Sequence, residues 1–232
     1  NYLKINRMAG FFKSSIGQKL FMSITGLFLI MFLLVHLTVN SFLVFDCTGE
    51  LFNKGAHFMV TNPIIRIVEP VLFIGFIVHI IYAIILTLQN QFARPVGYNK
   101  YNPKREVTWA SRNMFVLGGL VLIFLVIHII NFYVKMRFGH IGTVTYDGVE
   151  MENGFKLVTE LFSIWWYNLI YIAGAIFLGL HLHHAFWSAL QTIGWSNAKW
   201  RRRLEIIGDV YAVIVAAGFA FIAFFFLVQT CV

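Results

Sequence analysis

Five long apolar stretches limit what this chain can fold into more than any other feature of its sequence. They cover residues 20–45, 64–88, 114–133, 161–190 and 210–228. A helix rises about 1.5 Å per residue and the hydrocarbon layer of a bilayer is about 30 Å thick, so each stretch can cross it as a helix. A membrane strand would need only about ten residues. The sequence therefore predicts an all-α bundle of five transmembrane helices, with residues 1–232 forming one membrane domain.

The composition of the 232 residues supports the same conclusion. Hydrophobic residues make up 59% of the chain and charged residues 12%, and the mean hydropathy is +0.76. Soluble domains carry about a quarter charged residues, so this chain lacks the polar surface that a globule in water needs. A cytosolic enzyme is therefore excluded. The two cysteines, Cys47 and Cys231, are too few for a disulfide framework, a thiolate zinc site or an iron–sulfur cluster.

Charged residues are unevenly divided between the two sides of the predicted bundle. Thirteen of the eighteen Lys and Arg residues fall on the side of the amino terminus, and seven of the ten Asp and Glu residues fall on the other side. Because cytoplasmic loops carry the excess of Lys and Arg, we expect the amino terminus in the cytoplasm. The net charge of +8 then reflects membrane topology, and no nucleic-acid partner is expected. Lipid surrounds the apolar faces.

Six of the eight histidines lie within the apolar stretches, and the first four stretches each supply at least one. Counted from the cytoplasmic ends, His36 and His128 lie about 25 and 22 Å deep, whereas His79 and His181 both lie about 15 Å deep. Two stacked bis-histidine haems require two levels with two imidazoles each, whereas zinc would need four ligands at one level. The alternative is that each histidine is an ordinary hydrogen-bonding residue between helices.

The last cluster of histidines offers three candidate ligands, of which His181 is preferred. His184 lies on a similar face but nearer to the interface, and His183 points elsewhere. Glycines near the predicted ligands would either leave room for a flat ring or allow helices to pack closely: Gly75, Gly174 and Gly179.

Two parts of the sequence resemble a known family. Residues 15–19 (SIGQK) and 25–29 (TGLFL), followed by His36, are similar to the opening signature of the di-haem cytochrome b subunits of succinate:quinone oxidoreductases, which include quinol:fumarate reductases. The stretch from His181 to Trp195 resembles the fourth helix of that family, where the residue matching His181 is an axial ligand. The resemblance covers essentially the whole chain. It implies an outer haem b held by His36 and His128 and an inner haem b held by His79 and His181.

The resemblance also implies partners and a location. A flavoprotein subunit and an iron–sulfur subunit would be anchored at the cytoplasmic face of a bacterial inner membrane, and this chain would be the quinone-reactive electron-transfer subunit. It has no flavin fingerprint and too few cysteines for clusters, so FAD and iron–sulfur clusters are expected in the partner subunits only. By analogy with the family, menaquinone is the expected quinone. The sequence leaves open whether succinate oxidation or fumarate reduction is the working direction, and whether the complex forms a dimer.

Glu69, ten residues before His79, is the candidate acceptor of the protons that quinol oxidation releases on the outer side. The alternative is a surface acid that pairs with Arg66. Some family members carry a glutamate beside the fourth-helix ligand, but Gly179 occupies that neighbourhood here. Four residues near the cytoplasmic side are candidates for contact with anionic haem propionates or with quinone: Arg112, Ser111, Ser23 and Lys19.

Two other functions fit parts of the pattern. One is a haem-free membrane anchor or transporter whose histidines form hydrogen bonds or relay protons. The other is a di-haem cytochrome b that stands alone or serves a different enzyme. Cytochromes of the quinol:cytochrome c type carry paired histidines on each of two helices, and the single matched histidine on each helix here argues against that arrangement.

Overall fold

The computed structural model describes residues 14–93, 109–195, 197 and 199–228, and it is predominantly helical. Its elements are, in order, α2 (Ser15–Phe45), α3 (Glu50–Thr61), α4 (Pro63–Phe92), α5 (Trp109–Arg112), α6 (Met114–His128), the π-helical segment η1 (Ile129–Val134), α7 (Lys135–Phe138), β1 (Thr143–Tyr146), β2 (Val149–Glu152), α8 (Gly154–Phe162), α9 (Trp165–Thr192) and α10 (Arg201–Val228). The predicted all-α class is confirmed, and the strands of the described residues form one antiparallel hairpin.

Five helices are long and apolar enough to cross a membrane, as the sequence predicts. They are α2, α4, the continuous helix Met114–Phe138 made of α6, η1 and α7, α9 and α10. Large apolar side chains remain exposed along these helices, for example Met31, Ile74 and Ile123. Such exposure is stable where lipid rather than water is the solvent. The chain is therefore a multi-pass membrane protein.

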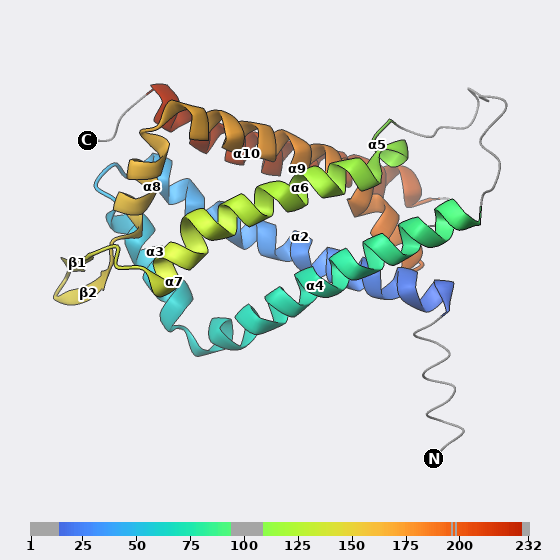
Figure 1. Cartoon of the computed structure of the whole chain (residues 1–232), viewed down its shortest axis with the longest axis horizontal. Coiled ribbons are helices and arrows are strands. Elements are labelled where there is room, and N and C mark those ends of the chain that lie inside the picture. The colour runs from blue at the N-terminus through green and yellow to red at the C-terminus, as the bar shows by residue number, and fades with distance from the viewer. Residues whose placement is uncertain (1–13, 94–108, 196, 198, 229–232) are drawn as a thin grey trace, which may run out of the picture.

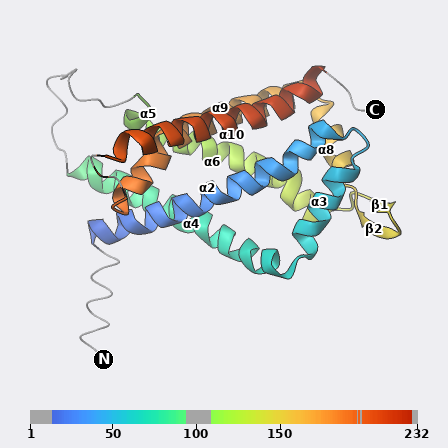
Figure 2. The same ribbon diagram turned by 180° about the vertical axis from the view of Figure 1, so that it is seen from behind.

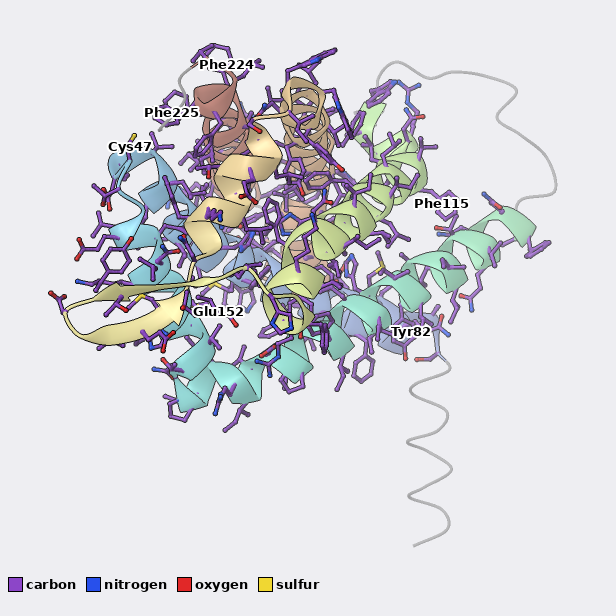
Figure 3. The ribbon with its side chains drawn as sticks, turned by 60° about the vertical axis from the view of Figure 1, so that its left-hand side comes forward. Cys47, Tyr82, Phe115, Glu152, Phe224 and Phe225 are labelled. Atoms are coloured by element: carbon purple, nitrogen blue, oxygen red, sulfur yellow. The ribbon has the colours of Figure 1, made fainter. Side chains whose placement is uncertain are left out.

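The helix α2 lies in the middle of the bundle, between α4 on one side and the pair α9–α10 on the other (Figure 1). Seen from behind, α2 lies in front of the other long helices (Figure 2). The helices α9 and α10 pack along each other, and α6 packs against α9. Within the described residues, α4 packs mainly against α2 and α3. As a result α4 and α6, which carry the labelled Tyr82 and Phe115, stand apart on one side of the bundle (Figure 3).

The two ends of the bundle differ in charge. We call the end where α2 and α10 begin the basic end, and its described basic residues are Lys19, Arg112, Lys199, Arg201, Arg202 and Arg203. We call the opposite end, which carries the β1–β2 hairpin, the hairpin end, and the predicted acidic group lies there: Asp46, Glu50, Glu69, Asp147, Glu150, Glu152 and Glu160. Other basic residues of the predicted cytoplasmic side lie outside the described residues: Lys4, Arg7, Lys13, Arg94, Lys100, Lys104 and Arg105.

A layer formed by α3, the hairpin and α8 covers the hairpin end, and the sequence did not predict it. Lys54 on α3 forms ion pairs with Asp147 of the hairpin and with Glu50, and these raise the pKa of Lys54 above its ordinary value. The buried side chain of Asn53 accepts a hydrogen bond of 2.9 Å from the backbone N–H of Phe155. The first contact joins α3 to the hairpin and the second joins α3 to α8.

The turn after α2 is organised by Asp46. Its carboxylate accepts hydrogen bonds from the backbone N–H groups of Leu51 and Thr48, both at 2.9 Å, and these bonds hold the pKa of Asp46 below its usual value. Gly49 follows with a φ of 78°, a left-handed conformation that favours glycine. The chain is thereby turned into α3 directly outside the membrane-spanning helix.

The prediction of a single fourth stretch over residues 161–190 is wrong at its beginning. The helix α8 ends at Phe162 and α9 begins at Trp165, because Ile164 is extended with φ −91° and ψ 102°. The buried side chain of Asn168 donates a hydrogen bond of 2.7 Å to the carbonyl of Phe162, one of the acceptors that a helix end leaves open. Hydropathy does not reveal this break, because Leu161 and Phe162 are themselves buried apolar residues.

The three glycines noted in the sequence serve helix packing. A Cβ on Gly179 would lie 2.6 Å from the Cβ of Ala216 on α10, and a Cβ on Gly174 would overlap the ring of Phe124 on α6. Gly75 faces the ring of a phenylalanine on α2 in ordinary contact, at 3.4 Å. Of the two interpretations left open by the sequence, close helix packing is therefore the one that describes these positions.

Replacing Gly179 with alanine is expected to lower the thermal unfolding midpoint of the detergent-purified protein. The added methyl would overlap Ala216 and push α9 away from α10, and overpacking of this kind costs about 1–3 kcal/mol. Gly119→Ala is the matched control, because nothing lies within 4 Å of the Cβ it would add. Since alanine is the better helix former, this control should keep or raise the midpoint. Equal midpoints for the two variants would contradict the close contact.

Candidate functional site

A cavity of about 2520 Å³ extends through the bundle, and its lining is mostly apolar. Its walls come mainly from α2, α4, α6 and α9, and the four predicted ligands all line it: His36, His79, His128 and His181. Pockets for drug-sized molecules measure about 300–1,000 Å³. The cavity is therefore large enough for more than one flat organic group, and each of its four main walls carries one of these histidines.

The first histidine pair lies in the half of the bundle nearer to the hairpin end. The ring centroids of His36 on α2 and His128 on α6 are 5.6 Å apart, and the two rings are nearly perpendicular at 86°. Aromatic rings surround the pair, with Phe219 5.6 Å from His36 and Tyr171 6.0 Å from His128. The structure thus brings together the two histidines that the depth count assigns to the same level.

The second pair consists of His79 on α4 and His181 on α9, which both line the cavity in the half nearer to the basic end. Each ring lies against a glycine of a neighbouring helix. A Cβ on Gly26 of α2 would lie 3.3 Å from the Cε1 of His79, and a Cβ on Gly118 of α6 would lie 3.6 Å from the Cε1 of His181. The sequence analysis did not identify either glycine as part of the site. Two features of the sequence could have pointed to these glycines. Gly26 lies within the TGLFL run, and Gly118 begins a Gly-Gly pair in a stretch of otherwise bulky residues.

The hydroxyl of Thr25 lies beside the Nδ1 of His79 and offers an acceptor for a proton on that nitrogen. The Thr25 hydroxyl donates to backbone carbonyls of its own helix, at 2.8 Å to Phe21 and 3.0 Å to Met22, so its single proton is already used. Its oxygen also lies 3.4 Å from the Nδ1 of His79, and the remaining arrangement is that Nδ1–H donates to it. The Nε2 of His79 then keeps its lone pair. This is the tautomer that a metal ligand needs.

His181 presents a different chemical situation. Its Nδ1 is buried and has no hydrogen-bond partner among the described residues. Nearly all buried polar atoms in native proteins are hydrogen-bonded, and each exception calls for an explanation. The ring of His181 therefore lies at the wall of the apolar cavity, with this nitrogen turned toward α6.

The other histidines lie outside the two pairs. His183 points away from the cavity, as predicted, and its Nδ1 lies 2.7 Å from the carboxylate of Asp209 on α10 at the exposed surface. His184 is half-buried and lines the cavity toward the basic end. In the layer at the hairpin end, His57 is half-buried and His140 is exposed. The structure therefore separates the three clustered histidines by orientation.

The four predicted ligands form two pairs, so each pair could supply two protein ligands to one metal ion. Within the described ranges, no three His, Cys, Asp or Glu side chains converge to hold a metal ion. Two imidazoles at one level are the protein ligands that a bis-histidine haem would take, since its porphyrin would supply the other ligands of the iron. The four residues predicted to meet propionates or quinone also line the cavity, at its basic end: Lys19, Ser23, Ser111 and Arg112. These are the residue types that would hold the iron and the propionates of a haem.

Glu69 lines the same cavity near the hairpin end. Its hydrogen-bond partner is Tyr133, and not Arg66 as the surface-acid alternative supposes. The hydroxyl of Tyr133 donates a hydrogen bond of 2.7 Å to the Glu69 carboxylate. Arg66 instead donates through Nε to the backbone carbonyl of Val60 at 3.1 Å, and no ion pair with Glu69 is formed in the described part of the chain. The surface ion pair with Arg66 is thus not what the structure contains.

The π-helical segment η1 begins directly after His128 and ends at Val134. In a regular α-helix, two side chains that are five positions apart point in directions that differ by about 140° around the helix axis. In a π-helix the i to i+5 bond places such residues about one turn apart. Tyr133 and His128 can therefore both line the cavity, although five residues separate them. Single π-helical turns are frequent at functional sites.

Comparison of the chain with protein-family models, curated proteins and solved structures finds no match. The paired histidines, the cavity and the polar residues at its two ends are therefore the observations from which a function can be argued.

Thr25→Val is expected to weaken the retention of a group bound to His79 by about tenfold, because partners that orient a metal-ligating histidine typically contribute that much or more to affinity. Thr25→Ser is the matched control, since it keeps the oxygen that accepts from the Nδ1–H of His79. The measurement is the haem-to-polypeptide ratio of the purified protein after extended washing in detergent. If both variants retain haem equally well, Thr25 does not orient the ring.

Proposed function

We propose that this chain is the di-haem cytochrome b subunit of a succinate:quinone oxidoreductase, working as a succinate dehydrogenase or a quinol:fumarate reductase. The observation that carries this proposal is the pairing of four intramembrane histidines at two levels of one cavity. The rings of His36 and His128 lie 5.6 Å apart, and His79 and His181 line the same cavity nearer to the basic end. Intramembrane ionisable residues are costly to bury and usually functional. The motif resemblance at the first and fourth helices supports the same assignment.

Bound haem would supply reversible one-electron chemistry at two positions along the membrane normal. The chain contributes two imidazoles to each position, which leaves no open coordination site and favours electron transfer over oxygen binding. The positive charges of Arg112 and Lys19 at the basic end would complement the anionic propionates of the inner group. Phe124 and Tyr171, which line the cavity, help to exclude water from the histidine level nearer to the hairpin end.

The partners belong at the basic end, which we place in the cytoplasm of a bacterial cell. Lys199 and the three arginines that begin α10 are exposed there and would face an iron–sulfur subunit and a flavoprotein subunit carrying FAD. The hairpin end would then face the outside. Cys47 at that end is disulfide-bonded, and disulfides persist in oxidising compartments, which supports this orientation.

The hairpin end would be the site of quinone chemistry. A quinol that gives up two electrons also gives up two protons, and two described carboxylates line the cavity toward this end, Glu69 and Glu152. Glu69 is the one that lies on a membrane-spanning helix. A menaquinol could lie against the apolar lining while its hydroxyl groups reach this carboxylate. The protons would leave toward the hairpin end, and the electrons would pass by way of the two histidine pairs toward the basic end.

Replacing His36 or His128 with leucine should remove one haem and leave the second in place, because the two pairs use different residues. For His79→Leu or His181→Leu, the inner haem should be lost and the outer haem should stay in place. The measurement is the haem stoichiometry and the redox titration of the purified complex. Loss of both haems in equal measure from every variant would contradict the pairing, and a colourless parent complex would favour the haem-free anchor.

His183→Leu is the matched control for these variants. His183 lies two residues from His181 in the same helix, but it contacts Asp209 at the surface instead of lining the cavity. The haem content should therefore stay at the parent value. A variant with reduced haem would overturn the choice of His181 within the cluster.

Glu69→Gln is expected to slow quinol oxidation by at least about tenfold, since general acid–base groups contribute about 10²–10⁴ to rates. Fumarate reduction with an artificial viologen donor should be unchanged, because that donor bypasses the membrane subunit. Both rates are measured on the same purified complex. Unaltered quinol turnover would show that Glu69 is not the proton acceptor.

A further inference from the structure

We propose that Tyr133 is a positioning residue that holds the Glu69 carboxylate in place to receive the quinol proton. This inference rests on the proposed quinol chemistry at the hairpin end. It concerns a residue that the sequence pattern did not single out. Tyr133 acts through Glu69, and its own phenolic proton is retained throughout.

The contact itself is well suited to this role. The Tyr133 hydroxyl donates to a carboxylate oxygen of Glu69 at 2.7 Å, and both side chains are half-buried. A hydrogen bond to a charged acceptor is short and roughly twice as strong as one between neutral groups. The bond occupies one carboxylate oxygen and leaves the other free to accept a proton from a substrate hydroxyl in the cavity.

The second support is the place of this contact in the bundle. Within the described residues, α4 packs mainly against α2 and α3, and the helix containing Tyr133 packs mainly against α9. Tyr133 links these two helices. Its hydroxyl donates to Glu69 of α4, and its ring contacts that of Phe73, also on α4, with centroids 5.0 Å apart. Without it, Glu69 would be free to take other rotamers along the open side of the cavity.

The third support is the π-helical segment. Because η1 begins after His128, the ring of Tyr133 can point to the same cavity as the imidazole of His128. With regular α-helical geometry the five-residue spacing would turn Tyr133 away by about 140°. The irregular segment therefore brings Tyr133, together with the Glu69 carboxylate to which it donates, and a predicted haem ligand to one end of one cavity.

The chemical step balances with Tyr133 in this role. Each of the two O–H bonds of the quinol would break, the two electrons would pass by way of the haem groups that the two histidine pairs would hold to fumarate in the partner subunits, and the protons would pass in turn to Glu69. From Glu69 they leave to water at the hairpin end. Tyr133 keeps its O–H bond and returns Glu69 to the same position after each transfer.

Tyr133→Phe tests this proposal, because phenylalanine preserves the ring contact with Phe73 and removes only the hydroxyl. With a water-soluble naphthoquinol as donor and fumarate as acceptor, kcat of the purified complex should fall about tenfold, while KM changes by less than about twofold. The haem content and the viologen-driven rate of fumarate reduction should equal those of the parent. Loss of haem from this variant would reveal a structural role and overturn the proposal.

The double variant Tyr133→Phe with Glu69→Gln distinguishes action through Glu69 from an independent effect. If Tyr133 acts through Glu69, the double variant should be no slower than Glu69→Gln alone, because the residue to be positioned is already gone. Multiplied losses would overturn the proposal. Tyr146→Phe is the matched control, since its hydroxyl contacts a backbone carbonyl of Thr48 outside the cavity, and it should keep the parent rate.

The failure of this inference can be told apart from failure of the proposed function. A parent complex without haem or without quinol-dependent fumarate reduction would contradict the proposed function. A parent complex that has both, with Tyr133→Phe at the parent kcat, would contradict only the role of Tyr133.

Discussion

The hydrocarbon of the membrane cannot hydrogen-bond, and every polar group placed in it must therefore find a partner inside the protein or a bound ligand. The five long helices meet this requirement for the backbone. The intramembrane histidines meet it in different ways: His79 bonds to Thr25, His183 pairs with Asp209 at the surface, and the Nδ1 of His181 lacks a protein partner among the described residues. The side chains that line the cavity thus include polar rings whose needs the helices meet unequally.

The number of helices and the two histidine levels could be predicted from the sequence, because bilayer thickness and helical rise convert position along the chain into depth. Depth says nothing about rotation around a helix axis. For this reason the glycines that face His79 and His181 were missed, while Gly174 and Gly179, which are closer in sequence to His181, prove to contact other helices. The break before Trp165 was missed for a related reason, since hydropathy does not distinguish an amphipathic surface helix from the start of a span.

The environment of Glu69 illustrates the same limit at the candidate quinol site. Its depth and its place on the outer side could be read from the sequence, but Arg66, one turn away, was the nearest visible partner. The structure pairs Glu69 with Tyr133, which is 64 residues away in the sequence, through a helix whose register is changed by η1. A π-helical turn depends on how one backbone fits its neighbours, and no residue type signals it. Tertiary contacts of this kind are therefore learned from the structure alone.

The size of the cavity bears on how such a bundle can assemble. Helices that line an open cavity of about 2520 Å³ gain little mutual attraction across that space, and lipid chains or a collapsed packing would compete to occupy it. The helices can insert into the membrane before the cavity is filled. Tight association of α4 with α6 and α9, however, would require a group that fills the space between them. The supply of the proposed haem would thereby decide whether newly made chains mature or are removed by proteolysis, which would couple the abundance of the protein to haem biosynthesis.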